Sequence, residues 1–216
     1  MGLTRIQKLR REEFADAAIE VFYEHGVSDA TFDLVAKKAG VSKSNVLHYF
    51  ESKTALIEAA FRRYARSYAQ EVDALLKRTE TPWERVYAVI EANFSKSLFL
   101  PEVTRAYVYL CAEASGNETL TRLLQALTKR MHSNLVFALR EVTEPDRADA
   151  VAQMIGLAIR GLWLRCASEP GAVSRVEAMD QLDFLLGSQK HRTGKQANGA
   201  WPISSPSLLV STRKCL

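Results

Sequence analysis

The segment TFDLVAKKAGVSKSNVLHYFESK, residues 31–53, contains two short helical patterns separated by a glycine turn. Thr31 and Ser42 each precede an apolar-periodic run, and a hydroxyl at that position accepts hydrogen bonds from the first backbone N–H groups of a helix. Gly40 ends the first pattern because glycine adopts backbone conformations that other residues resist. The turn AGVS has the spacing of a helix-turn-helix, and Ser52 caps a third, longer helix. The segment therefore predicts a helix-turn-helix unit.

The second helix of this unit carries polar side chains where a recognition helix meets DNA. Val46, Leu47 and Phe50 are its expected apolar positions, which leaves the outer side and the N-terminal half for base edges. Asn can bond adenine bidentately, and Lys reaches guanine acceptors or phosphate. Hydroxyls, cations and helix N-termini bind phosphate without reading sequence. We predict DNA contacts from eight residues: Thr31, Ser42, Lys43, Ser44, Asn45, His48, Tyr49 and Lys53.

Helical periodicity continues through the rest of the chain, and strand alternation is nearly absent. Apolar residues at three- and four-residue steps, ended by Gly26, predict a first helix at about 5–25. The helix after Ser52 continues to about residue 78, and breakers such as Pro82 and Pro101 separate the elements that follow. We predict an all-α fold of about nine helices, the later ones at 82–99, 101–115, 117–142, 146–168 and 173–187.

This pattern divides the chain into three parts. Residues 1–52 are expected to form a three-helix helix-turn-helix domain. A long helix joins it to an all-helical ligand-binding and dimerisation domain at 53–187. Residues 188–216 are rich in Ser, Gly, Pro and Lys, and we expect them to form a basic, disordered tail.

The charge distribution distinguishes this protein from a general nucleic-acid binder. The net charge is +4 at pH 7, but residues 187–216 contain five Lys or Arg and no acid, so the preceding part carries about −1. An architectural DNA-binding protein needs cations throughout its surface, whereas a phosphate array needs them clustered on one face. Clusters occur before the first helix and around the turn: Arg5, Lys8, Arg10, Arg11, Lys37, Lys38, Lys43 and Lys53.

Side chains for catalysis or metal binding do not occur in a recognised pattern. The four His residues are scattered, the three Cys residues include no C-x-x-C pair, and neither a glycine-rich phosphate loop nor a nucleophile elbow is present. We therefore expect no enzyme activity, no cofactor and no metal site.

The stretch ADAVAQMIGLAIRGLWLRCA, residues 148–167, is apolar on nearly all sides. Such a helix must be buried on several faces. A second copy of the chain can bury the remaining face, through a four-helix interface that includes residues 173–187. Membrane insertion is the competing interpretation, but Gln153, Arg160 and Arg165 are costly in hydrocarbon. Since the N-terminus lacks a signal-peptide core, we expect a cytoplasmic homodimer without membrane contact.

The segment TFDLVAKKAGVSKSNVLHYFESKTALIEAAF, within about residues 12–61, resembles the DNA-binding domain of the TetR family of bacterial transcriptional regulators. The pattern AGVS followed by HYF, SK and L is highly specific for that family. The resemblance implies a three-helix DNA-binding domain attached to an all-helical regulatory domain. It also implies a dimeric repressor that binds a palindromic double-stranded DNA operator and is released by a small-molecule inducer.

Three C-terminal segments are similar to the choline-responsive, BetI-like branch of this family: VIEANF at 89–94, HSNLVFALR at 132–140 and GLWLRCA at 161–167. The similarity implies choline or betaine aldehyde as the inducer. Aromatic faces near a carboxylate bind a quaternary ammonium, and the candidate ligand-binding residues are Glu91, Phe94, Tyr107, Glu113 and Trp163.

One position departs from this branch. Its members tend to carry an acid just before GLWLR, whereas this chain has Arg160. A cation at that position would repel choline and could pair with an anionic or neutral polar ligand. The alternative function is therefore a regulator of another pathway, such as efflux or catabolism, with a neutral or anionic inducer.

Overall fold

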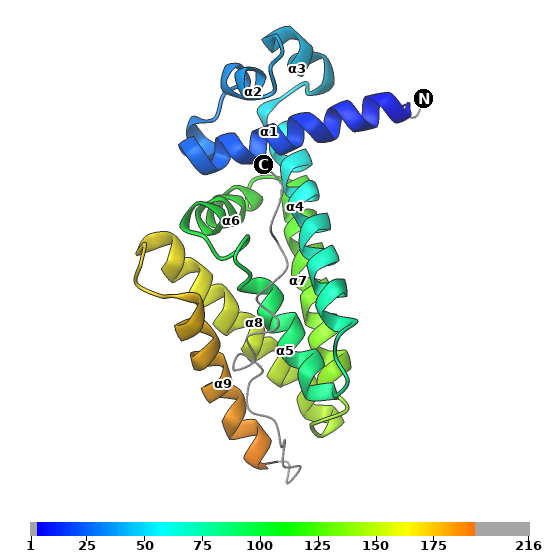
Figure 1. The fold of residues 1–216 in the computed structure, drawn as a ribbon, viewed down its shortest axis with the longest axis vertical. Helices are drawn as coiled ribbons and strands as arrows, with labels where there is room; N and C mark the ends of the chain where they lie inside the picture. Colours follow the sequence, from blue (N-terminus) through cyan, green and yellow to red (C-terminus); the bar gives the residue numbers. More distant parts are fainter. Residues whose placement is uncertain (1–3, 193–216) are drawn as a thin grey trace.

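The computed structural model describes residues 4–192, and their side chains as far as residue 187. Within that range the chain forms helices and no strand, which confirms the all-α prediction (Figure 1). The elements are α1 (Arg5–Asp29), α2 (Phe32–Lys38), α3 (Lys43–Tyr49), α4 (Lys53–Leu76), α5 (Pro82–Asn93), α6 (Pro101–Ala114), α7 (Glu118–Leu139), α8 (Pro145–Ser168) and α9 (Arg175–Arg192).

The helix-turn-helix unit begins and ends where its capping residues predict. The hydroxyls of Thr31, Ser42 and Ser52 accept hydrogen bonds from backbone N–H groups of the first turns of α2, α3 and α4, at 3.3, 3.3 and 3.1 Å. Gly40 has φ +66° between α2 and α3, a region that L-residues avoid. Gly26 has φ +78° and interrupts α1, but the helix resumes and reaches Asp29 rather than ending at residue 25.

A small core holds α3 against α1. Val46 and Phe50 of α3 are 0% exposed and pack with apolar residues of α1, α2 and α4. Leu47 is 42% exposed, so the prediction that it belongs to the apolar side of the helix was wrong. Since adjacent helix positions lie about 100° apart, burial of Val46 and Phe50 turns Leu47 outward. Leu47 therefore belongs to the outer surface of α3.

The helix α4 extends from the helix-turn-helix unit into the larger helical body (Figure 1). Arg63 of α4 donates two hydrogen bonds to Asp16 of α1, at 2.7 and 3.1 Å, and Arg66 donates one to Glu12 at 3.0 Å. On its other side α1 packs against α6, because Ala106 and other apolar residues of α6 belong to the same core as the helix-turn-helix unit. The helix-turn-helix unit therefore rests on both α4 and α6.

The prediction of one helix at 82–99 was wrong, because α5 ends at Asn93. The backbone carbonyl of Asn93 accepts a hydrogen bond from the indole Nε1 of Trp163 at 3.0 Å. The carbonyl of Phe94 accepts one from Nε of Arg175 at 2.6 Å. These donors come from later parts of the chain and take carbonyls that a continuing helix would use internally.

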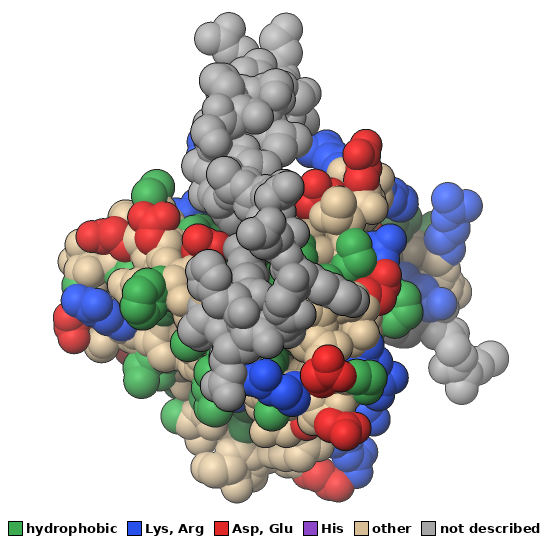
Figure 2. Space-filling model, turned by 90° about the horizontal axis from the view of Figure 1, so that it is seen from below, with side chains coloured by type: hydrophobic (Ala, Val, Ile, Leu, Met, Phe, Trp, Pro, Cys, Tyr) green, Lys and Arg blue, Asp and Glu red, His purple; other side chains and the backbone are tan. Residues whose placement is uncertain are grey.

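The helix α9 continues to Arg192, five residues past the predicted end at 187. The first part of the segment expected to be a disordered tail is therefore helical. The rest of the predicted tail, residues 193–216, lies outside the described residues. At the end of the molecule far from α2 and α3, Figure 2 shows acidic and basic side chains interspersed with apolar ones. That mixture agrees with the low net charge expected for the body of the chain.

Candidate functional site

The outer side of α3 carries an exposed polar surface at one end of the molecule (Figure 1). Lys43, Ser44, Asn45 and His48 are all exposed there, and Ser42 caps the helix. Because Val46 anchors the opposite side, these side chains point away from the core. A short helix with exposed amide, imidazole and ammonium groups can enter the major groove of DNA and bond to base edges.

The other predicted DNA contacts surround this surface. Thr31 lies at the N-terminus of α2, and Lys53 begins α4, where its Nζ donates to the carbonyl of Ser28 at 2.5 Å. Tyr49 is half-buried, with its ring packed edge-on against Phe14 at a centroid distance of 5.3 Å. The structure thus brings all eight predicted residues to the helix-turn-helix unit, six of them on α3 or at its cap.

The ammonium of Lys43 is engaged within the protein but remains available. Its Nζ lies 2.7 Å from Oδ2 of Asp33, and the two side chains are 52% and 66% exposed. An ion pair as exposed as this contributes little to stability. Lys43 can therefore exchange Asp33 for a DNA phosphate or base at small cost.

One member of the basic clusters has a structural role that the sequence did not reveal. Nη1 of Arg11 donates to the backbone carbonyl of Tyr49 at 2.6 Å. Its guanidinium also lies over the ring of Phe50, 4.4 Å from the centroid. Arg11 therefore caps the C-terminal end of α3 from α1 and fixes the orientation of the polar surface.

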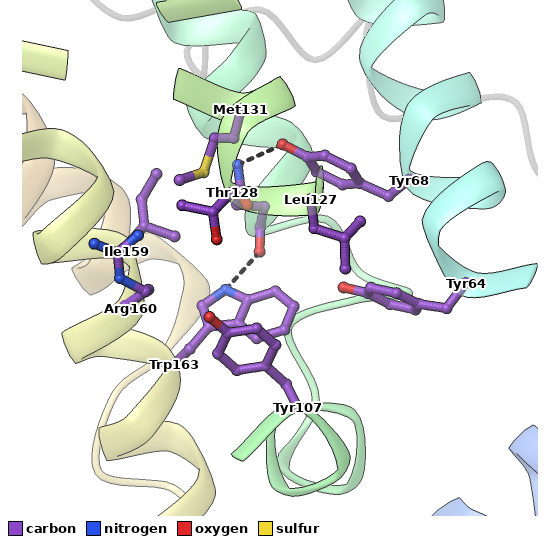
Figure 3. Close-up of a pocket in the computed structure, with 10 residues that line it drawn as sticks. Tyr64, Tyr68, Tyr107, Leu127, Thr128, Met131, Ile159, Arg160 and Trp163 are labelled. Atoms are coloured by element: carbon purple, nitrogen blue, oxygen red, sulfur yellow. Dashed lines mark hydrogen bonds between the residues drawn. The ribbon is translucent and has the colours of Figure 1, made fainter. Parts of the chain in front are cut away.

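A second candidate site is a cavity inside the helical body (Figure 3). Four aromatic rings line it, together with Asn93 and residues of α7 and α8: Tyr64, Tyr68, Tyr107, Trp163, Leu127, Thr128, Met131, Ile159 and Arg160. The lining comes from α4, α5, α6, α7 and α8.

Hydrogen bonds hold the cavity wall in place. Nδ2 of Asn93 donates to the hydroxyl of Tyr68 at 3.0 Å and to the carbonyl of Val89 at 2.8 Å. Trp163 donates to the Asn93 carbonyl, and its ring meets that of Tyr107 edge-on at 5.2 Å. Burial raises the pKa of Tyr68 to about 12 and also raises that of Tyr107. The two phenols are therefore neutral at physiological pH.

The predicted ligand-binding residues are not all brought together. Tyr107 and Trp163 line the cavity, whereas the carboxylate of Glu91 pairs with Arg175 at 2.7 Å. Phe94 is fully buried against Phe99, and Glu113 is exposed on α6. Glu91, Phe94 and Glu113 therefore do not line the cavity.

Sequence analysis missed Tyr64 and Tyr68 as candidate ligand residues. Both continue the apolar stripe of α4, so they have the spacing of ordinary core residues. Only their hydroxyls distinguish them from core residues in the sequence, because a buried Tyr hydroxyl needs a hydrogen-bond partner.

The outward side of α8 is apolar. Leu157 and Leu164 are 63% and 54% exposed, and Phe184 of the neighbouring α9 is 86% exposed. Gly161 lies between the two leucines on α8, and a Cβ added there would meet open space. Among the described residues, α8 is also the one helix long and apolar enough to cross a membrane. It packs against α6 and α7 here, as the core helix of a globular body does.

A helix-turn-helix unit coupled to a helical body with an aromatic-lined cavity is the arrangement of a ligand-responsive transcriptional regulator. The N-terminal part, residues 14–60, matches the model of the tetR family of bacterial regulatory proteins, and residues 82–189 match that of the BetI-type transcriptional repressor C-terminal domain. The chain belongs to the TetR family and has a BetI-type C-terminal domain, as the sequence resemblance implied.

Relatives agree with this assignment over most of their length. The HTH-type transcriptional regulator BetI of Brucella anthropi is 39% identical over 184 residues, covering 85% of this chain and 95% of the relative. BetI of Rhizobium meliloti is 32% identical over 201 residues, covering 93% and 97%. A transcriptional regulator from Saccharomonospora viridis, solved in complex with choline, has the same fold. Its TM-score is 0.76 at 18% identity, over 83% of this chain and 96% of that one.

The role of Arg11 can be tested against its neighbour Arg10, which forms only an exposed ion pair with Glu13 at 2.9 Å. Arg11→Met should lower the free energy of unfolding by about 1.5 kcal/mol, because a carbonyl loses a charged donor. Arg10→Met should change it by less than about 0.5 kcal/mol. Urea denaturation measures both values. Equal effects of the two substitutions would contradict the role given to Arg11.

Proposed function

We propose that the protein is a dimeric repressor that binds a palindromic operator through α3. The observation that carries the proposal is the exposed polar surface of α3, with Asn45 and His48 at its centre and Val46 anchored behind them. In this proposal Asn45 and Lys43 contact base edges. Thr31, Tyr49 and Lys53 lie around them as contacts to phosphate, which position the protein without specifying sequence.

Two copies of α3 must reach successive major grooves, so the second copy is part of the function. The exposed apolar side of α8, with Leu157 and Leu164, supports a two-fold interface completed by α9. Gly161 between the leucines allows the partner helix to approach closely. The two α3 surfaces then lie about 34–36 Å apart, or a multiple of that.

The cavity is the site proposed for the inducer, and a trimethylammonium compound such as choline or betaine aldehyde suits it. Four aromatic rings around one cavity can hold a quaternary ammonium by cation–π attraction. The family assignment and the choline bound to the S. viridis regulator support this choice. A neutral or anionic inducer is the alternative, and Arg160 in the cavity wall is the observation that favours it.

A route from the cavity to α1 supports the regulatory role. Tyr64 and Tyr107 also line a second, smaller cavity beneath α1, together with Phe22 and Tyr23 of that helix. A ligand that displaces either tyrosine changes the packing of α4 and α6 against α1. Since α1 carries the helix-turn-helix unit, this repacking changes the placement of α3.

The DNA-binding proposal predicts different effects for two substitutions. Asn45→Ala should cost about 1–3 kcal/mol at the best site and relax the choice of base, because an amide contact to a base is lost. Lys53→Ala should weaken all sites alike, because it removes a phosphate contact. Binding-site selection followed by titration of individual duplexes measures both effects. Equal affinity of the intact protein for its selected site and for random DNA would refute sequence-specific binding.

The dimer proposal predicts that Leu157→Asp yields a monomer at micromolar concentration, because the interface would bury an unpaired carboxylate. Phe137→Asp is the matched control, since Phe137 is 68% exposed on α7. It should leave the mass unchanged. Light scattering of the full chain checks both variants, and a wild-type protein that is monomeric at this concentration would contradict the proposal.

A further inference from the structure

The cavity has a positive charge in its wall. Among its described lining residues Arg160 is the one side chain that is ionised at neutral pH, and neither Asp nor Glu lines the cavity. Figure 3 shows Arg160 on α8, across the cavity from Tyr64 and Tyr68 of α4. Trp163 lies on α8 as well, with Tyr107 against it, so the site combines four aromatic rings with one guanidinium.

The charge of Arg160 is not neutralised within the described part of the chain, where it forms no ion pair. Arg165, on the same helix, pairs with Glu169 at 3.7 Å, and Arg175 pairs with Glu91 at 2.7 Å. The charge also acts on the cavity. Burial raises the pKa of Tyr107 and of Cys111, and Arg160 opposes the rise in each.

Glu71 and Glu91 belong to helices that contribute to the cavity, but neither carboxylate lines it. Glu91 is engaged with Arg175, as described above. Glu71 of α4 has its pKa raised, chiefly by burial. A ligand that carried only a positive charge would meet one cation in the wall and no carboxylate.

The aromatic rings and the guanidinium suit two different groups. Aromatic faces attract a trimethylammonium group. A guanidinium has a planar set of donors that matches a carboxylate and binds it more strongly than a neutral oxygen. The side chain of Arg160 also lines the groove between α7 and α8, and its Nη1 lies 3.6 Å from a Cβ built on Gly156. It therefore lies at the edge of the cavity, where a carboxylate on a short chain can reach it.

We propose that the inducer is a zwitterion, with a trimethylammonium group among the aromatic rings and a carboxylate on Arg160. Arg160 is then the residue that selects a betaine-type compound over a quaternary ammonium alcohol. This inference rests on the proposed function, because it specifies the ligand class of the same cavity.

Four compounds of nearly equal shape separate the two charges. Trimethylammonioacetate carries both, choline carries only the cation, 3,3-dimethylbutanoate carries only the carboxylate, and 3,3-dimethylbutan-1-ol carries neither. Isothermal titration of the full-length protein should give an affinity for the zwitterion at least tenfold above that for each of the other three. Choline binding as tightly as the zwitterion, or more tightly, would overturn the inference.

Substitution of Arg160 gives the decisive comparison. Arg160→Gln should weaken trimethylammonioacetate at least tenfold while leaving choline unchanged or tighter, and Arg160→Lys should retain the preference for the zwitterion. Arg165→Gln is the matched control and should change neither affinity. If the ratio of the affinity for trimethylammonioacetate to the affinity for choline is the same in Arg160→Gln as in the wild type, the inference is overturned. This holds also if the substitution lowers both affinities by weakening the dimer.

The failure of this inference is distinguishable from the failure of the proposed function. If choline binds best and still releases DNA, the trimethylammonium site stands and the zwitterion is rejected. If only 3,3-dimethylbutanoate binds, or none of the four compounds, the trimethylammonium site is rejected as well.

Discussion

The continuity of α4 is the constraint on which the rest of this molecule depends. A helix from Lys53 to Leu76 is about 36 Å long, and its two halves belong to different cores. Leu56 and Ile57 pack in the helix-turn-helix unit, whereas Tyr68 and Val72 pack in the helical body. Because a helix cannot bend sharply without breaking its hydrogen bonds, a displacement at one half of α4 is transmitted to the other.

This constraint explains why the ligand cavity and the DNA surface can be coupled although different helices build them. Tyr64 lies midway along α4 and contributes to both the ligand cavity and the smaller cavity beneath α1. The ion pairs of Arg63 with Asp16 and of Arg66 with Glu12 connect the same part of α4 to α1. In the proposed function, a movement of α4 caused by the ligand would be carried to α1, the helix that packs behind α3.

Features set by local chemistry could be predicted from the sequence. The caps Thr31, Ser42 and Ser52 begin their helices because a side-chain hydroxyl satisfies nearby N–H groups. The exposed polar surface of α3 was predictable as well, since its residues lie within one short segment. The end of α5 was not, because it depends on Trp163, 70 residues away, donating to the carbonyl of Asn93. Likewise, the sequence suggested Glu91 as a ligand residue, but in the structure its carboxylate pairs with Arg175, which is 84 residues away.

The central claim is that the cavity and α3 share one equilibrium, and thermodynamic linkage tests it most directly. Coupling between two binding sites is reciprocal, so a ligand that weakens operator binding by some factor must itself bind more weakly, by that factor, when the operator is bound. Titrating a trimethylammonium ligand into the free dimer and into the dimer saturated with its selected operator measures this. The account predicts equal factors in the two directions, between 5-fold and 150-fold. An operator affinity that does not change in saturating ligand would contradict it.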